Sequence, residues 1–160
     1  MRNHDLTVFT EDGVLNLRVG AIILKEGRIL MVGNERADYL YSVGGRIHFG
    51  ETAEEAVVRE VLEETGVKME IDRLGFVHEN FFSGDAGNVA GKKVHEISFF
   101  FYMKTPKDFT PVCGSFTDDY SRERLVWVDL EEERKYYPAF FKEELRCPVR
   151  RVKQIVTREI

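Results

Sequence analysis

The chain has 160 residues, of which 43% are hydrophobic and 32% are charged, and its formal net charge at pH 7 is −5. This length and composition predict one domain over residues 1–160 with its own packed core. The acidic balance argues against binding to duplex nucleic acid, which usually requires a basic face, but not against a small anionic substrate, because a bound metal ion can reverse the local charge.

The cysteines and the apolar segments predict a cytoplasmic protein. Cys113 and Cys147 are far apart and lack metal-ligand spacing, so we expect two reduced thiols of an intracellular protein in preference to a disulfide. The N-terminus has no apolar stretch of signal-peptide length. The longest apolar run, 97–103, is interrupted by Ser98 and is too short to span a bilayer, so no membrane contact is expected.

The first third of the chain reads as strands and turns. A short strand is expected at 6–10, and a stronger, β-branched strand at 17–25. Glu26 and Gly27 suit a tight turn, after which 28–32 would return as the second strand of a hairpin. A further strand at 39–43 leads into Gly44 and Gly45.

The next segment, 52–65, predicts a helix with defined ends. Thr52 is a suitable N-cap, and Glu55 three residues later completes a capping box. Gly66 suits the position just after the helix, where a left-handed backbone is common.

The remainder of the chain mixes strands with short helices. Strands are expected at 69–77, 94–104 and 125–130, and the consecutive phenylalanines of 94–104 indicate burial on both faces and a central position in the sheet. The other expectations are a glycine-rich loop at 83–93, an irregular segment at 105–121, short helices at 131–135 and from 138 onward, and an undecided tail at 149–160. This order favours a mixed β-sheet covered by helices, in the α+β or α/β sandwich range.

Three carboxylates on the predicted helix indicate a metal site. At about 100° per residue, Glu60, Glu63 and Glu64 share one face. They repel one another and lie in the last turns, where the helix dipole favours cations, and no lysine or arginine follows four residues later to pair with them. A bound Mg²⁺ would relieve these penalties, because it takes carboxylate, water and phosphate oxygens. The alternative is a solvated acidic helix held by the packing of its other face.

The stretch from Gly45 to Val67 resembles the Nudix box. Each defined position of that motif is filled, which has a chance of about 10⁻¹⁰ per starting position at average residue frequencies. The matching residues are Gly45, Glu51, Arg59, Glu60, Val61, Glu63, Glu64, Gly66 and Val67. One departure is Val43, where many members of the family have proline before the two glycines.

The resemblance implies a Nudix-like α/β/α sandwich in which the box forms a loop, a helix and a loop. It also implies a hydrolase that cleaves a pyrophosphate bond with Mg²⁺ or Mn²⁺. Carried over by position, Glu60 and Glu64 would be the main metal ligands, and Glu63 a further ligand or a residue that orients water. The Gly45 carbonyl would contribute to the metal shell, and Arg59 and Glu51 would support the carboxylates.

The general base is not fixed by the box. We prefer Glu96, at the start of the 94–104 strand, as the base or an additional metal ligand, and keep Glu79 as a second candidate. For Glu96, the alternative is a surface glutamate on an edge strand. The two histidines beside them, His78 and His95, are expected to be structural or to face substrate, since Mg²⁺ prefers oxygen ligands.

Substrate selection is expected outside the box. Candidates are Arg46 beside the glycines, Phe81 as a stacking aromatic, and Lys93 as a phosphate contact, although an aromatic at position 81 could equally belong to the core. The small nucleotide substrate could be an ADP-ribose-like nucleotide sugar or a nucleoside or deoxynucleoside triphosphate. Homodimers are common in the family.

Three rival functions stay open at the level of sequence. An isomerase of isopentenyl diphosphate on the same fold would need a reactive cysteine and an altered box. A non-catalytic nucleotide-sensing module would usually show an eroded box, and a purely structural domain would lose nothing but stability on Glu64→Gln. The complete box favours hydrolysis over all three.

Overall fold

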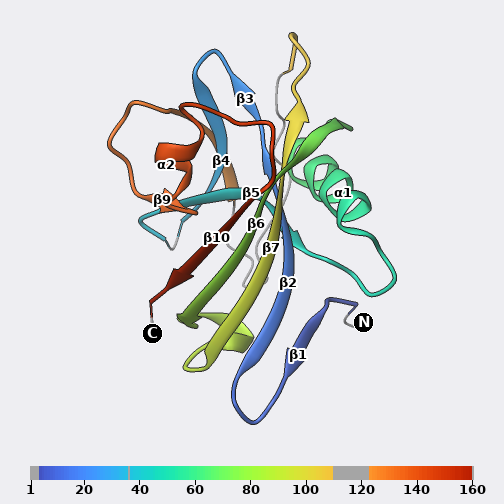
Figure 1. Cartoon of the computed structure of the whole chain (residues 1–160), viewed down its shortest axis with the longest axis vertical. Helices are drawn as coiled ribbons and strands as arrows, with labels where there is room; N and C mark the ends of the chain where they lie inside the picture. Colours follow the sequence, from blue (N-terminus) through green and yellow to red (C-terminus); the bar gives the residue numbers. More distant parts are fainter. Residues whose placement is uncertain (1–3, 36, 110–122, 160) are drawn as a thin grey trace.

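Ten strands of the chain join into one sheet in the computed structural model, which describes residues 4–35, 37–109 and 123–159 (Figure 1). The elements in chain order are β1 (Thr7–Phe9), β2 (Val14–Ile22), β3 (Leu24–Lys25), β4 (Arg28–Asn34), β5 (Leu40–Arg46), α1 (Ala53–Thr65), β6 (Glu70–Ser83), a 3₁₀ turn (Gly87–Val89), β7 (Lys93–Lys104), β8 (Glu123–Asp129), β9 (Tyr136–Tyr137), α2 (Phe141–Glu144) and β10 (Lys153–Arg158).

The sheet is mixed, as the sequence predicted. Its order is β10-β6-β7-β2-β5-β4-β3, and β1, β8 and β9 pair with β2, β4 and β5. The pairs β2–β7, β6–β10 and β5–β9 are parallel, and the others are antiparallel. β7 lies between β6 and β2, which confirms the central position predicted from its consecutive phenylalanines.

Side chains of β7 supply both hydrophobic cores. Because side chains alternate along a strand, Phe99 and Phe101 pack in the cluster that includes α1, whereas Phe100 and Tyr102 pack in the cluster that includes α2. The two helices therefore cover opposite faces of the sheet (Figure 1). This α+β arrangement confirms the expected fold class.

Helix α1 has the ends that the sequence predicted. The Glu55 backbone N–H donates to the Thr52 hydroxyl over 3.1 Å, and the Thr52 backbone N–H donates to the Glu55 carboxylate over 2.9 Å. Gly66 ends the helix with a φ of 77°, a left-handed conformation that favours glycine. The apolar face of the helix buries Ala56, Val57 and Val61 against the sheet.

Several predicted elements have different limits. The strand expected at 69–77 continues to Ser83, and the undecided tail is strand β10 at the edge of the sheet. The helix expected at 131–135 is wrong, because the Asp129 carboxylate accepts the Glu131 backbone N–H in a local turn and the chain then extends into β9. A residue that bonds its own backbone in this way favours a turn over a helix.

Other expectations concern residues that lie partly outside the described ranges. The irregular segment at 105–121 falls largely there, as does Cys113, while Cys147 is an exposed free thiol. In the part of the chain that is described, neither helix is long and apolar enough to cross a membrane.

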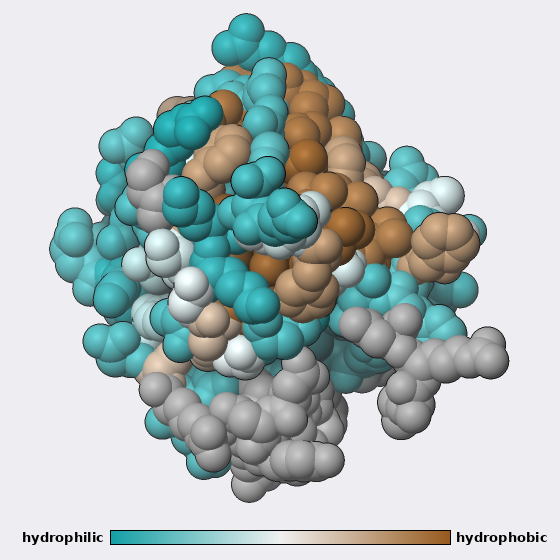
Figure 2. Space-filling model, turned by 90° about the horizontal axis from the view of Figure 1, so that it is seen from below, coloured by the Kyte–Doolittle hydropathy of each residue, from teal (hydrophilic) through white to brown (hydrophobic). Residues whose placement is uncertain are grey.

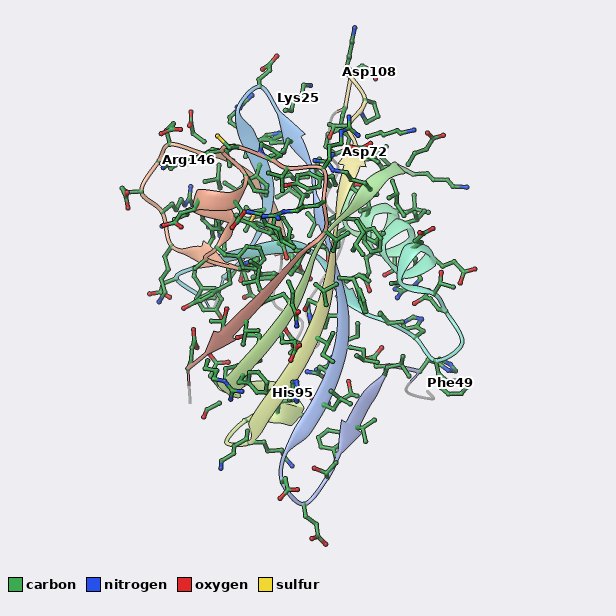
Figure 3. All side chains as sticks on the ribbon, in the orientation of Figure 1. Lys25, Phe49, Asp72, His95, Asp108 and Arg146 are labelled. Carbon is green, nitrogen blue, oxygen red and sulfur yellow. The ribbon has the colours of Figure 1, made fainter. Side chains whose placement is uncertain are left out.

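The helices leave part of the sheet uncovered. The lower halves of β2, β6 and β7 extend beyond α1 in Figure 1, and apolar side chains gather on the surface seen from below in Figure 2. Phe49, in the loop before α1, is 82% exposed and projects away from the fold (Figure 3). One core lies beside the box helix α1, and the other lies beside α2 on the opposite face of the sheet.

Removal of the N-cap should weaken the fold measurably. We expect Thr52→Ala to lower the free energy of unfolding by about 1 kcal/mol, because two backbone N–H groups lose their capping arrangement. Urea denaturation checks this, with exposed Lys68→Ala as the control. Equal midpoints for Thr52→Ala and the wild-type protein would contradict it.

Candidate metal centre and adjoining pocket

Two glutamates of α1, the half-buried Glu60 and the buried Glu64, lie directly against the two glycines of β5. A Cβ atom at Gly45 would stand 2.4 Å from Oε1 of Glu60, so a side chain there would displace the carboxylate. Glu64, one turn later, accepts a hydrogen bond from the Gly44 backbone N–H. Gly45 is therefore needed because the Glu60 carboxylate occupies the space that a side chain would fill, whereas a Cβ atom at Gly44 would meet the backbone of Val19 and Gly20 in β2.

Arg59 ties the helix to the loop that precedes it. Its Nε and Nη2 atoms donate to the two carboxylate oxygens of Glu51 over 2.8 and 2.9 Å, a bidentate contact. Its Nη1 atom donates to Glu60 over 2.8 Å and to Glu63 over 3.4 Å, and Nη2 also donates to the Arg46 carbonyl over 3.0 Å. One side chain thus orients three carboxylates and the end of β5.

The Glu51 carboxylate is held in its charged form. The hydrogen bonds from Arg59, and one from the His48 backbone N–H, lower the pKa of Glu51 from its ordinary value of about 4.5 to about 2. The same contacts raise the pKa of Arg59. Because both groups stay charged at any ordinary pH, this pair acts as a fixed clamp.

The described residues leave the charged form of the Glu64 carboxylate poorly compensated. It is 8% exposed, and its Oε2 atom is buried without a hydrogen-bond partner in the described ranges. Burial raises its pKa well above the usual value, and the neighbouring Glu123 and Glu60 raise it further. Burial also raises the pKa of Glu60. The positive charge of Arg18 lowers the pKa of both glutamates. A cation beside these oxygens would relieve this cost.

Glu123 is a member of this cluster that sequence reasoning missed. It is the first residue of β8, and it accepts a hydrogen bond of 3.2 Å from the hydroxyl of Tyr41. Alternation along β8 puts Glu123 on the same face as Leu125 and Trp127, the face that α1 covers. Its position depends on the pairing of β8 with β4, for which the sequence gives no signal.

The donors fit a hard divalent cation. Carboxylate oxygens of Glu60, Glu64 and Glu123 suit Mg²⁺ or Mn²⁺, and the buried unpartnered oxygen of Glu64 is a natural ligand atom. Within the described ranges, no three His, Cys, Asp or Glu side chains converge tightly enough to complete a metal site by themselves. A cation here would therefore also need oxygens from water or substrate, as is usual for Mg²⁺.

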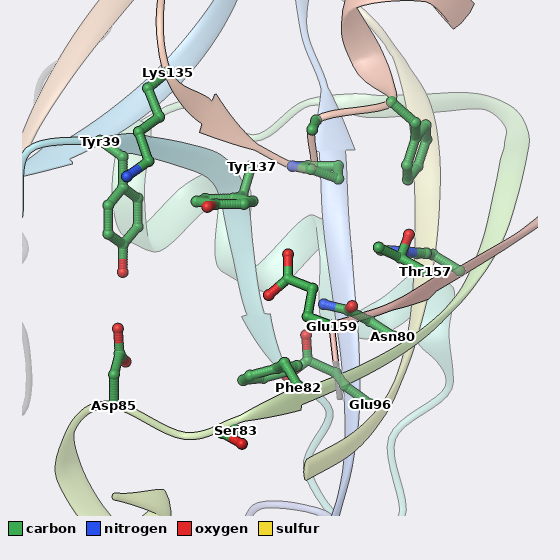
Figure 4. Close-up of a pocket in the computed structure, with 14 residues that line it drawn as sticks. Tyr39, Asn80, Phe82, Ser83, Asp85, Glu96, Lys135, Tyr137, Thr157 and Glu159 are labelled. Carbon is green, nitrogen blue, oxygen red and sulfur yellow. The ribbon is translucent and has the colours of Figure 1, made fainter. Parts of the chain in front are cut away.

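A cavity of about 370 Å³ opens on the other face of the sheet, between β6, β7, β10 and the segment that leads into α2 (Figure 4). A second cavity of about 200 Å³ adjoins it and shares Tyr39, His78, Glu96, Tyr137 and Pro138. This second cavity is also lined by Arg18, the cation that acts on Glu60 and Glu64. The two adjoining cavities form a path that has Arg18 at one end, and none of the box glutamates lines it.

The structure brings together some of the predicted substrate and base residues and not others. Glu96 lines the cavities on the α2 face, while the box glutamates project from α1 on the opposite face. Glu79, one position earlier than Asn80 in β6, bonds Gln154 over 2.9 Å and does not line them.

The three predicted specificity residues are dispersed. Arg46 supports the box through its carbonyl, and its guanidinium contacts Asp5 and Asn88 over 3.4 Å each. Phe81 packs against His95, at the lower end of β7 in Figure 3, with 4.2 Å between ring centroids. Lys93 lines a separate depression at the turn between β1 and β2.

The alternation of side chains along β6 decides which of Phe81 and Phe82 faces the larger cavity. Side chains of consecutive residues point to opposite faces of a strand, so Phe82 and not Phe81 lines the large cavity. The register of β6 against β7 cannot be read from the sequence, so the sequence does not tell which of the two phenylalanines faces the cavity.

Loss of the Arg59–Glu51 contact should destabilise the protein in a pH-dependent way. We expect Glu51→Gln to lower the free energy of unfolding by about 1–3 kcal/mol at pH 7. Because the folded pKa of Glu51 is about 2 and its ordinary value about 4.5, this difference should be complete above pH 4.5 and should vanish as the pH falls toward 2.

Denaturation at pH 7 and at low pH checks this expectation. Exposed Glu54→Gln in the same helix serves as the control and should have little effect at either pH. A Glu51→Gln variant as stable as the wild type at pH 7 would contradict the proposed clamp.

Comparison with known proteins supplies the family. The family model of the NUDIX domain matches residues 14–147. A MutT-like protein from Streptomyces ambofaciens is 35% identical over 65 residues, which are 41% of this chain and 42% of the relative, so the match spans less than half of that protein.

Solved structures agree in fold. A MutT NUDIX hydrolase from Burkholderia pseudomallei superposes with a TM-score of 0.59 at 23% identity, over 76% of this chain and 88% of its own. An ADP-ribose pyrophosphatase from Streptococcus suis superposes with a TM-score of 0.58 at 16% identity, over 87% of this chain and 98% of its own. With the complete box on α1 and the family match over most of its length, this chain belongs to the NUDIX family.

Proposed function

We propose that this protein uses Mg²⁺ or Mn²⁺ to hydrolyse the pyrophosphate bond of a small nucleotide. The substrate is either a nucleoside diphosphate linked to another group, as in ADP-ribose, or a nucleoside or deoxynucleoside triphosphate. The observation that carries the proposal is the pair of Glu60 and the buried Glu64, packed on Gly45 and Gly44, with one oxygen of Glu64 unpartnered in the described residues.

The metal would be held by carboxylates on the α1 face. Glu60 and Glu64 would be its main ligands, with Glu63, Glu123 and the Gly45 carbonyl as further donors, and the bound ion would neutralise phosphate charge and activate water. Arg59 keeps Glu60 and Glu63 oriented through its hydrogen bonds, so the ligands need little rearrangement. Glu63 is 55% exposed at its side chain, which suits it to orient an attacking water molecule.

The two cavities are the proposed binding site for the substrate. Arg18 lines the smaller cavity and acts electrostatically on the box glutamates, so its guanidinium is suited to meet the phosphates. Glu96 lines both cavities, and its position favours contact with substrate over the role of general base that we expected from the sequence. The larger cavity has the size of a typical small-molecule site.

A panel assay tests the reaction. Purified protein with Mg²⁺ should release phosphate, after coupling to a phosphatase, from at least one member of a panel of nucleotide sugars, dinucleotides and nucleoside triphosphates. Glu64→Gln should lower kcat by at least about 100-fold, because a metal ligand is lost. The control is exposed Glu54→Gln, which should keep the wild-type rate.

Two results would overturn the hydrolase proposal. One is the absence of turnover on every panel member, and the other is equal turnover by the wild type and Glu64→Gln. The first would favour a nucleotide-sensing module.

Metal binding should also be visible without any substrate. Mg²⁺ should raise the Tm of the wild-type protein by several degrees, because an ion that binds only the folded state stabilises it. Glu64→Gln should lose most of this effect and, without metal, should be more stable than the wild type by about 1–3 kcal/mol, since a buried, uncompensated charge is removed.

Thermal denaturation with and without Mg²⁺ measures both effects. Ca²⁺-free, chelator-treated protein provides the baseline. A Tm that does not respond to Mg²⁺, or a response that Glu64→Gln retains in full, would contradict a metal site at this position.

A further inference from the structure

The larger cavity on the α2 face is a built pocket with aromatic walls. Tyr39 and Tyr137 meet edge to face, with ring centroids 5.2 Å apart, and Phe82 closes the lower wall (Figure 4). These rings come from the loop before β5, from β9 and from β6, three segments distant in the sequence. Flat apolar walls of this kind suit a planar ring.

Polar side chains with unused hydrogen-bonding capacity line the two cavities. Ser98, which is 4% exposed, lines the smaller cavity. His78 is 5% exposed; burial lowers its pKa to about 4, so it is neutral, and only its Nε2 atom is bonded, to the Thr157 hydroxyl over 2.9 Å. The Oδ1 atom of Asn80 is also unpartnered among the described residues. Because buried polar groups are normally hydrogen-bonded, these groups indicate a polar ligand.

The charges along the path are segregated. Asp85, Glu96 and Glu159 line the larger cavity, and within the described ranges none of these carboxylates is in an ion pair or a side-chain hydrogen bond. Lys135 lies at the same cavity, but its Nζ atom is 3.9 Å from Asp38, which does not line it. Arg18 lies toward the box glutamates. The path therefore has a cationic end suited to phosphate and an acceptor-rich end that repels it.

We propose that the larger cavity binds the base of the substrate and that its carboxylates select a base with an exocyclic amine. This inference rests on the proposed function and names the substrate class of that site. An ionised carboxylate can only accept hydrogen bonds, so it binds a ligand with N–H donors more tightly than one without them. Stacking on Tyr39, Tyr137 or Phe82 would hold the ring, and the amine would face Asp85, Glu96 or Glu159.

Matched nucleosides test the inference without phosphate or metal. Adenosine and purine riboside differ only by the 6-amino group, and titration of each into ¹⁵N-labelled protein, followed by chemical-shift changes, gives affinities into the millimolar range. We expect adenosine to bind at least about tenfold more tightly, because a hydrogen bond to a charged group is lost in purine riboside. Guanosine and inosine form a second pair that differs only by the 2-amino group, and at least one of the two pairs should show this preference.

Variants then identify the carboxylate. Asp85→Asn, Glu96→Gln and Glu159→Gln remove one charge each, and at least one should reduce the amine preference to about twofold or less. Glu143→Gln is the matched control, because Glu143 is exposed on α2 and lies outside the cavity. It should leave the preference unchanged.

The outcomes separate this inference from the proposed reaction. Nucleoside binding without amine preference, a preference that survives all three variants, or no binding up to the solubility limit would overturn the base pocket, whatever the hydrolysis assay shows. Stronger binding of inorganic pyrophosphate at the Asp85 end than of nucleosides would overturn it as well. Absence of turnover with intact amine-selective binding would overturn only the hydrolase proposal.

Discussion

The hydrogen bonds of Arg59 are the contact on which the rest of the site depends. This guanidinium holds Glu51 in the loop, Glu60 and Glu63 on the helix, and the carbonyl of Arg46 at the end of β5. A lysine could supply the charge but not the planar fork that reaches several oxygens at once. The loop, helix and strand are thereby locked together before any ligand binds.

The contacts of Arg59 hold the site together although a neighbouring group, the Glu64 carboxylate, is in an energetically unfavourable environment. Glu64 is buried with an unpartnered oxygen, near Glu60 and Glu123, at a helix end where the dipole favours cations. Packing of Ala56, Val57 and Val61 on the sheet and the capped N-terminus of α1 supply the stability that offsets it. Locally unfavourable groups held by a well-packed scaffold are characteristic of functional sites.

The two faces of the sheet carry different parts of the proposed reaction. The α1 face holds the acidic cluster, and the α2 face holds the cavities. Gly44 and Gly45 lie in β5 directly against the glutamates of α1, and Arg18 on β2 acts on the cluster while it lines the smaller cavity. Arg18 is thus the charge that connects the acidic cluster of one face with the cavities of the other.

The sequence by itself determined the local features: the capping box, the end of α1 at Gly66, the shared face of Glu60, Glu63 and Glu64, and the central strand β7. These depend on residues close together in the chain, whose geometry follows from helical and strand periodicity. Only the tertiary structure decided that Glu123 joins the cluster, that Phe82 and not Phe81 lines the pocket, and that Glu96 faces a cavity with Asp85 and Glu159. Each of these depends on strand register and on pairing between distant segments, and a shift of one residue would turn the same side chains to the opposite face.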